Sequence, residues 1–543
     1  MKRILYIFLL FCVLSVAAQP KHEVRAVWLT TLGGLDWPHS YAHDGMGIQQ
    51  QKEDLCRMLD QLKAINVNTI LFQTRVRATT AYPSDLEPWE GSFSGVPGKT
   101  PGYDVLQFAI DECHRRGMEI HAWVVAIPIG KWNTAGCKWV RRRYPSLVKR
   151  IGEEGYMNPE AHGTADYIAN ICEEITTRYD IDGIHLDYIR YPETWRGRMH
   201  HENITRIVRR VNERVKRHKP WVKMSCSPIG KFGNLSRYRS NGWDAYNRVA
   251  QDAQGWLRDG LMDQLYPMMY FSGNNFYPFA IDWQEQSCGR TIVSGLGTYM
   301  LHPTERNWAL SEVKRQLNVT RQLGIGHCHF RTKFLLDNVK GIYDYMLQSD
   351  RYLALTPPMT WAQSVAPTAP TRLDVERTLG GDNLSWSGAI DQSDSPYLLY
   401  NIYASTEEPV DITQPENLLV IRHCGQQISI RRKSDKPMLH YAVTALDRYG
   451  NESAPIRSMD KTTAPVVQTT LLFNNGRLLN VPQRNLFDAD LLMVCDLKGR
   501  TVQTYTNRQQ INISRLPEGM YILKSLHKKG HIHRLGFFSI KRK

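Results

Sequence analysis

Eight short apolar segments alternate with eight amphipathic stretches between Glu23 and Leu355, and this alternation limits the possible folds more than any other feature of the 543-residue chain. The apolar segments have the length of buried strands, and the amphipathic stretches have the period of surface helices. Strict alternation of this kind implies parallel strands joined by helical crossovers. Eight such units predict an α/β protein with a (β/α)8 TIM barrel and enlarged loops.

The alternative α/β architecture is an open, doubly wound sheet. Such a sheet usually carries a glycine-rich GxGxxG turn after its first strand, and residues 32–37 lack that pattern. The expected strands cover residues 24–30, 69–75, 119–125, 183–189, 221–227, 263–270, 291–297 and 326–331. The expected helices cover residues 50–65, 103–117, 161–179, 201–218, 243–258, 278–288, 305–323 and 338–348.

The first 18 residues predict a secretory signal peptide. Lys2 and Arg3 precede an apolar run over residues 4–14, and small residues follow at positions 16–18. The run is too short to span a bilayer, and no other segment is long and apolar enough to do so. We therefore expect an exported protein without a transmembrane segment, located outside the cell, at its surface or in the periplasm.

Two smaller β-rich regions follow the expected barrel. Residues 356–371 contain four prolines and no periodicity, which predicts a linker. Residues 372–460 alternate in the manner of strands and predict a small β-sandwich. The sequence of residues 441–453 resembles the last strands of a fibronectin type III domain, and the resemblance makes Trp386 the core tryptophan.

A last β-rich unit covers residues 466–543. Its segments 491–502 and 511–523, with a Leu-Pro-x-Gly-x-Tyr core at 516–521 and a basic end at 541–543, resemble the C-terminal sorting domain of the type IX secretion system of Bacteroidota. The resemblance implies export across an outer membrane and the secretion machinery as a partner.

The chain carries a formal net charge of +15, which indicates either an anionic partner or a general surface excess. A basic run at residues 138–143, with Lys149 and Arg150, either contacts an acidic glycan or is a solvated surface. Neither this run nor the basic helix at 206–219 is interleaved with stacking aromatic residues. We therefore expect no nucleic-acid partner.

Residues at the ends of the expected strands predict a carbohydrate site, because the chemistry of a (β/α)8 barrel lies at the carboxyl ends of its strands. These positions are rich in aromatic residues, which stack on sugar rings, and in arginines and carboxylates, which bond hydroxyl groups. The candidate substrate-binding residues are Trp28, Gln73, Arg75, Tyr82, His121, Trp123, His185, Arg190, Tyr191, Tyr270, Tyr299 and Arg331.

The most informative segment is residues 181–192, which contains the first catalytic candidate, Asp187. Period two places Asp187 and His185 on one face of the strand, and Tyr188 on the other face. A carboxylate inside a barrel is costly to bury unless it is paired, and Arg190 or Arg75 is available to keep it ionised. An ionised, oriented aspartate suits a glycosidase nucleophile or base, and a structural salt bridge is the alternative.

Five motifs in order resemble the glycosyl-hydrolase-like 10 family within residues 23–350. They are residues 25–28, 73–75, 82–89, 121–123 and the Asp187 segment. The resemblance implies a (β/α)8 barrel that hydrolyses glycosidic bonds, without a metal or cofactor, and some members are associated with peptidoglycan strands stripped of their peptides. The sequence departs from the family at residues 124–130, which replace the usual Asn-Pro-Tyr-Arg.

A glycosidase needs a second carboxylate, about 5–5.5 Å from the first for retention or about 6.5–9.5 Å for inversion. Glu87 is the first choice, because the neighbouring Trp89 favours a raised pKa, and Asp282 and Glu285 are the runners-up. The overall prediction is a secreted glycoside hydrolase with a polysaccharide substrate. The alternatives are a non-catalytic glycan-binding protein and a metal-dependent hydrolase, for which His327 and His329 share a strand face.

Overall fold

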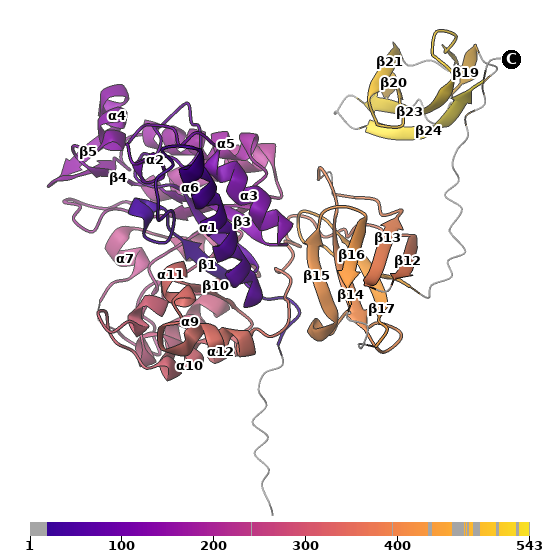
Figure 1. Ribbon diagram of the computed structural model, residues 1–543. Coiled ribbons are helices and arrows are strands. Elements are labelled where there is room, and N and C mark those ends of the chain that lie inside the picture. The colour runs from indigo at the N-terminus through magenta and orange to yellow at the C-terminus, as the bar shows by residue number, and fades with distance from the viewer. Residues whose placement is uncertain are drawn as a thin grey trace, which may run out of the picture. The chain divides into compact units, whose positions relative to one another are not determined.

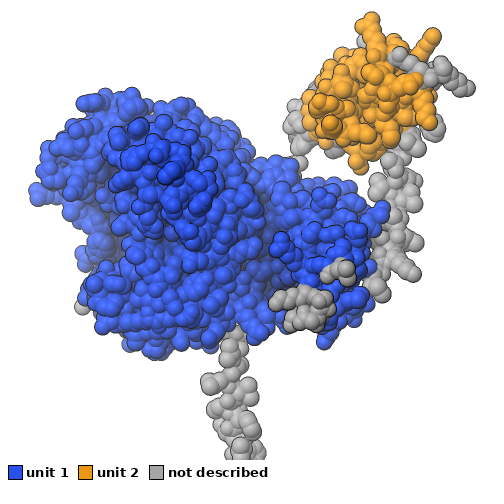
Figure 2. Space-filling view, viewed as in Figure 1, with its two compact units in different colours: residues 1–460 blue, residues 461–543 orange. Residues whose placement is uncertain are grey.

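The computed structural model describes residues 19–240, 242–378, 380–393, 395–432, 437–458, 472, 474, 477–481, 489–506, 510–527 and 532–541. The predicted signal peptide, residues 1–18, lies outside these residues. The chain divides into two compact units, residues 1–460 and 461–543 (Figure 2).

Unit 1 contains a closed barrel of eight parallel strands, which confirms the predicted (β/α)8 fold and replaces the doubly wound alternative. The order around the barrel follows the order in the chain. The strands are β1 (Arg25–Leu29), β2 (Thr69–Arg75), β3 (Glu119–Val125), β7 (Gly183–Asp187), β8 (Lys223–Cys226), β9 (Gln264–Leu265), β10 (Thr291–Leu296) and β11 (Gly326–His329). Every residue of β1, β2, β3 and β7 is buried, because helices cover the outside and side chains fill the inside.

Helices lie outside the strands (Figure 1). The helices of the barrel region are α1 (Gly45–Ala64), α2 (Gly91–Ser94), α3 (Val105–Arg115), α4 (Ala135–Arg143), α5 (Gly163–Arg178), α6 (His201–His218), α7 (Ala245–Val249), α8 (Ala253–Arg258), α9 (Tyr277–Glu285), α10 (Leu310–Gln322), α11 (Thr332–Leu336) and α12 (Ile342–Ser349). Asp44 and Asp104 cap α1 and α3 by accepting hydrogen bonds from backbone N–H groups three residues on. Helix α6 buries residues at helical spacing, among them Ile204, Val208 and Val211.

One predicted helix is broken in two, and one predicted strand is reduced to a fraction of its expected length. The predicted helix over residues 243–258 is two short helices, α7 and α8, because Ala250 between them takes a left-handed φ of 54°. The predicted strand over 263–270 is reduced to the two residues of β9, and Pro267, which has no N–H group for a ladder, follows it.

An insertion after β3 forms a small sheet that the sequence did not predict. We call residues 128–157 the cap. Its strands β4 (Pro128–Lys131), β5 (Val148–Ile151) and β6 (Glu154–Met157) pair in the order β4-β6-β5, and α4 connects β4 to the rest of the cap. Since β4 begins three residues after β3 ends, the cap stands at the carboxyl end of the barrel.

Residues 372–457 form two antiparallel sheets, in agreement with the predicted small all-β region. The first sheet orders β12 (Arg372–Thr378), β13 (Gly381–Ser387) and β16 (Gln427–Arg431), and the second orders β15 (Leu418–His423), β14 (Leu399–Ser405), β17 (His440–Leu446) and β18 (Ile456–Arg457). Trp386 is buried between them, with Tyr400 and Tyr441 in the same core. We call this region the sandwich; its resemblance to fibronectin type III stays a prediction.

The sandwich contacts the amino-terminal end of the barrel through buried ion pairs. Arg422 binds Glu119, the first residue of β3, at 3.1 Å, and it also binds Asp182, which precedes β7. Arg448 binds Asp180 at 2.7 Å. These side chains are almost fully buried, apart from that of Asp180, so the charges compensate one another inside unit 1.

Unit 2 is built of strands alone in its described part. The strands are β19 (Leu478–Asn480), β20 (Ala489–Cys495), β21 (Thr501–Thr506), β22 (Gln510–Asn512), β23 (Gly519–His527) and β24 (Ile532–Ile540), with sheets in the order β21-β20-β23-β24 and β19-β22. Leu492, Leu523 and Phe538 belong to its own core. Among all described residues of the chain, no helix combines the length and apolar character that a membrane crossing requires.

Candidate active site

A cavity of about 620 Å³ lies at the carboxyl ends of the barrel strands. Asp187, the last residue of β7, lies in its wall together with side chains from the ends of β2 and β3 and from the cap. The predicted residues that line it are Gln73, Trp123, Asp187, Arg190, Tyr270 and Arg331.

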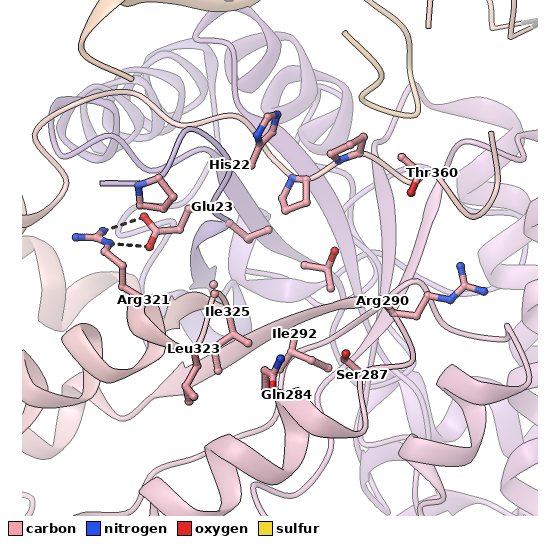
Figure 3. A pocket seen from close by; sticks show the side chains of 18 of the residues that line it. His22, Glu23, Gln284, Ser287, Arg290, Ile292, Arg321, Leu323, Ile325 and Thr360 are labelled. Atoms are coloured by element: carbon pink, nitrogen blue, oxygen red, sulfur yellow. Dashed lines mark hydrogen bonds and ion pairs between the residues drawn. The ribbon is translucent and has the colours of Figure 1, made fainter. Parts of the chain in front are cut away.

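A second cavity, of about 400 Å³, lies at the opposite end of the barrel (Figure 3). Thr291 and Gly326, the first residues of β10 and β11, line it, and so does Glu23, which precedes β1. An ion pair of 2.8 Å joins Glu23 to Arg321 there. Since barrel enzymes place their chemistry at the carboxyl ends of the strands, the cavity at Asp187 is the candidate active site.

The Asp187 carboxyl group is buried and receives three hydrogen bonds. Ser227 Oγ and the backbone N–H of Tyr188 donate to Oδ1 over 2.7 and 2.8 Å, and Trp123 Nε1 donates to Oδ2 over 3.1 Å. Oδ1 therefore has two donors and Oδ2 has one. An oxygen with one donor keeps a lone-pair position for a proton or a substrate atom, so Oδ2 is the more accessible of the two oxygens for such a contact.

Burial raises the pKa of Asp187 above that of an ordinary aspartate, against the opposing effects of Arg190 and the hydrogen bonds. The two arginines that the sequence suggested as partners bind other acids. Arg190 is paired with Glu193 and Arg75 with Glu87. The predicted direct ion pair of Asp187 is therefore absent from the described residues, and a raised pKa favours a proton-carrying role.

Arg190 is paired with one acid of the cavity and acts electrostatically on another. Its Nη2 donates to Glu193 over 3.1 Å, and its charge acts on Asp187. Its guanidinium carbon lies 4.1 Å from the ring centre of Tyr188, and its Nη1 is buried without a hydrogen-bond partner in the described chain. Glu193 also lines the cavity, with 32% of its side chain exposed. Asp187 and Glu193 thus form a candidate pair of carboxylates around one guanidinium.

Glu154 is a third acid in the cavity wall. It projects from β6 of the cap, is half-buried, and makes no hydrogen bond or ion pair through its carboxylate within the described residues. The sequence prediction did not include it, because the cap sheet was not foreseen.

The predicted partner acids lie elsewhere. Glu87 binds Arg75 through two hydrogen bonds of 2.7 and 2.8 Å, and both side chains are fully buried outside the cavity lining. Arg75 also donates to the carbonyl oxygen of Ala126 over 3.1 Å, so the pair ties β2 to the chain after β3. Asp282 accepts from Gln254, and Glu285 is paired with Arg237.

Several predicted sugar-binding residues form a layer beneath the cavity. Trp28 Nε1 donates to His185 Nε2 over 3.3 Å, and His185 Nδ1 lies 2.9 Å from Ser225 Oγ. Burial lowers the pKa of His185 well below its usual range, so the ring is neutral. Because Nε2 accepts the hydrogen bond from Trp28, the proton of the ring is on Nδ1. The predicted residues outside the cavity lining are Trp28, Arg75, Tyr82, His121, His185, Tyr191 and Tyr299.

Each of the others has a partner in the packed interior. His121 is 3.3 Å from Glu119, and Tyr82 donates to Glu174 over 2.8 Å. Tyr191 accepts from Asn203, and Tyr299 packs edge-on against Tyr270.

Tyr188 lies on the cavity and not on the buried face that period two predicted. Its φ of 51° turns the backbone out of β7 directly after Asp187, so the strand ends two residues earlier than predicted. Further aromatic surface comes from Phe330, which stacks on Tyr270 with ring centres 5.4 Å apart. The lining residues that the sequence does not single out include Thr30, Glu154, Tyr156, Glu193 and Phe330. Arg77, which follows the second predicted strand, also lines the cavity.

Gln73 presents its amide nitrogen as a free donor. Its Oε1 accepts hydrogen bonds from the hydroxyl group of Thr30 and from the backbone N–H groups of Thr31 and Leu32, all within 2.9 Å. Nε2 has no partner in the described part of the chain, and Gln73 lines the cavity. As for metal binding, the described residues bring together no group of three or more His, Cys, Asp or Glu side chains that would hold an ion.

Two family models match this sequence. Residues 23–201 and 193–294 match the glycosyl hydrolase-like 10 family, and residues 479–534 match a secretion system C-terminal sorting domain. The second match indicates secretion.

The relatives of the barrel are named as glycosyl hydrolases. The chain is 28% identical to glycosyl hydrolase YngK of Bacillus subtilis, over 80% of this chain and 93% of the relative. It is 26% identical to glycosyl hydrolase DigH of Escherichia coli K12, over 47% of this chain and 67% of the relative. A solved structure, alpha-L-fucosidase isoenzyme 2 from Paenibacillus thiaminolyticus, is 14% identical with a TM-score of 0.41, over 64% of this chain and 52% of the fucosidase.

Proposed function

This chain belongs to the glycosyl hydrolase-like 10 family, and from that premise we propose that it is a glycoside hydrolase that cleaves O-glycosidic bonds of a polysaccharide at Asp187. The observation that carries the proposal is the buried carboxyl group of Asp187 in the wall of a cavity lined by aromatic rings and other acids. Peptide-free peptidoglycan strands are the first substrate to test.

In the proposed mechanism Asp187 is the general acid. Its raised pKa supports a protonated Oδ2, which would donate to the glycosidic oxygen as the bond to the anomeric carbon breaks. Glu193 would act as the base, taking a proton from a water molecule whose oxygen adds to the anomeric carbon. This pair would invert the configuration, which requires carboxyl groups about 6.5–9.5 Å apart.

The cavity offers the two kinds of surface that a sugar needs. Trp123, Tyr188 and Tyr270 supply aromatic rings for the apolar faces of pyranose units, and Gln73 Nε2 supplies a donor for a hydroxyl group. The hydrogen bond from Trp123 to Asp187 would hold the acid against a sugar stacked on the same indole ring.

The test is hydrolysis by the purified chain on peptide-free peptidoglycan and a polysaccharide panel, measured as new reducing ends. Asp187→Asn should lower kcat by about 10²–10⁴-fold without loss of glycan binding. Glu193→Gln should do the same and recover with azide, because azide attacks the anomeric carbon without needing a base. The product of this rescue is a glycosyl azide, which has no reducing end and is measured by mass spectrometry. Glu285→Gln, in an ion pair away from the cavity, is the control.

Three results separate the alternatives. If azide rescues Glu154→Gln and not Glu193→Gln, the base is Glu154. Full activity of Asp187→Asn would refute the role of Asp187. Binding by the unaltered chain to a glycan with no hydrolysis of any panel member would favour a non-catalytic glycan-binding protein.

We propose further that the chain is exported by a signal peptide at residues 1–18 and delivered outside the cell by the sorting domain. The match of residues 479–534 supports this route. The proposed domains are residues 23–355, 372–460 and 466–543, with a linker at 356–371. Two sheets around Trp386 support a fibronectin type III-like middle domain.

A further inference from the structure

The wall of the candidate active site contains three guanidinium groups, and they differ in their partners. Arg331 donates to Asp36 and to the carbonyl oxygen of Leu35 over 2.5 and 2.7 Å. Arg190 is paired with Glu193. Arg77 is exposed and makes neither a hydrogen bond nor an ion pair within the described chain. Among these three, Arg77 is therefore the group that is open to an incoming anion.

The cap fixes the position of Arg77. A Cβ atom at Gly136 would lie 2.6 Å from the carbonyl oxygen of Arg77 and 2.5 Å from that of Ala78, so only glycine lets the cap approach this backbone. A Cβ atom at Gly130 would lie 3.5 Å from Arg77 Cβ and 3.7 Å from its Cδ. The stem of the arginine is thus packed against β4 while its head remains exposed, which lowers the entropy lost when a ligand binds.

The cavity face of the cap sheet adds positive charge. Directly paired residues of an antiparallel sheet point to the same side, and so do residues two apart. Tyr156 pairs with Lys149, and Glu154 pairs with Lys131, so both lysines share the face from which Tyr156 and Glu154 line the cavity. Lys149 Nζ lies 3.7 Å from the ring centre of Trp195, and Lys131 is exposed. This face of the cap sheet therefore carries two lysines and one glutamate, which leaves a net positive charge in addition to that of Arg77.

We propose that Arg77 determines substrate specificity by binding a carboxylate on the glycan, so that the substrate is an acidic polysaccharide. The proposal rests on the proposed function and names its substrate class. A guanidinium fork matches a carboxylate with two parallel hydrogen bonds, whereas a neutral sugar offers it only single hydroxyl groups. Two sources supply this chemistry: the lactyl carboxylate of muramic acid and the C6 carboxylate of a uronic acid.

The test is a binding measurement with two matched pairs of oligosaccharides. One pair is prepared from peptide-free peptidoglycan and the other from polygalacturonate, each with its carboxyl groups intact or reduced to alcohols. Calorimetry on the full chain with Asp187→Asn separates binding from turnover. We expect the intact form of one pair to bind about tenfold more tightly than its reduced form, and that pair identifies the source.

The same measurement on Arg77→Gln assigns the selectivity. This variant should lose about tenfold affinity for the intact form and none for the reduced form, and Arg77→Lys should fall between. Arg142→Gln, an exposed arginine of α4 without an ion pair in the described chain, is the matched control and should change neither affinity.

Two results would overturn the role of Arg77: equal binding of intact and reduced forms, or an equal loss on both forms in Arg77→Gln. A different result would contradict the hydrolase proposal while leaving the role of Arg77 intact. The unaltered chain would then release no reducing ends from a glycan whose carboxylate it still selects.

Discussion

The indole nitrogen of Trp123 donates a hydrogen bond to Oδ2 of Asp187 over 3.1 Å, joining the end of β3 to the end of β7. Both residues line the cavity, so in the proposed mechanism the ring that would stack on a sugar also holds Oδ2 of the acid. Under that proposal, one side chain would set both the position of the substrate and the orientation of the acid.

Replacing Trp123 by Phe should move the pH profile of hydrolysis. The hydrogen bond from Trp123 favours the ionised form of Asp187, so removing this bond raises the pKa of Asp187 further. Because a general acid is active only while it is protonated, the alkaline limb of the kcat/KM profile should shift to higher pH. Ser227→Ala removes another donor to Asp187 and should shift the limb in the same direction. A shift to lower pH in both variants would argue against Asp187 as the acid.

Glu87→Gln should destabilise the barrel strongly without changing the shape of the pH profile. The substitution leaves the buried Arg75 guanidinium without its counter-charge, at a cost of about 3–5 kcal/mol. Urea unfolding measures the cost, and Glu285→Gln is the control for an exposed ion pair. A variant that is as stable as the parent and lacks one limb of the profile would instead support a catalytic Glu87.

Gly183→Ala should destabilise the barrel by about 1–3 kcal/mol through overpacking. A Cβ atom there would lie 2.6 Å from Nδ1 and 2.7 Å from Cγ of His121, which is fully buried. The cost should shrink when His121 is Ala, because the clash partner is gone. An equal cost in both backgrounds, measured by thermal unfolding, would show that the ring is not the obstacle.

The ion pairs between barrel and sandwich should make unit 1 sensitive to acid. Burial alone would raise the pKa of Asp182, but the Arg422 guanidinium and His114 hold it well below its usual range, and the pKa of Glu119 is also lowered. Because these pKa values are lower in the folded chain, the unfolded chain takes up protons first as the pH falls. The stabilisation is therefore complete above about pH 4, which is the pKa of these acids in the unfolded chain. It is lost progressively as the pH falls below that value.

Arg422→Met should lower the free energy of unfolding at pH 7, and the difference from the parent should narrow below about pH 4 as the acids become protonated. Urea titrations at a series of pH values measure this. A difference that stays constant between pH 3 and 7 would show that the charge of Arg422 is not what stabilises the contact.

The fold was predictable because strand and helix periods are local properties of the sequence. The height of a side chain along the barrel axis is not a local property, and it explains why His185 does not reach the cavity. His185 shares a strand face with Asp187 but precedes it by two residues, which is roughly 6–7 Å lower along the strand. That distance places His185 in the layer under the cavity, where it binds Trp28 and Ser225. Asp187, one pleat higher, reaches the cavity wall.

The sequence does not predict the other two acids of the cavity wall, Glu154 and Glu193, for a different reason. Glu154 belongs to a sheet formed between β3 and α5, whose three short strands carry no periodic signal long enough to read. Glu193 follows the left-handed turn at Tyr188, which only the folded backbone reveals. Trp89 favours Glu87 in the sequence, but in the structure the Glu87 carboxylate binds the buried Arg75 guanidinium at 2.7 Å.

The placement of Arg422 also bears on how the molecule can be divided. A fragment ending at the proline-rich segment before residue 372 would expose Glu119 and Asp182 and leave both without the guanidinium that reaches them from the neighbouring fold. The sandwich therefore covers and stabilises the amino-terminal end of the barrel. We expect the barrel and the sandwich to unfold together in a single transition.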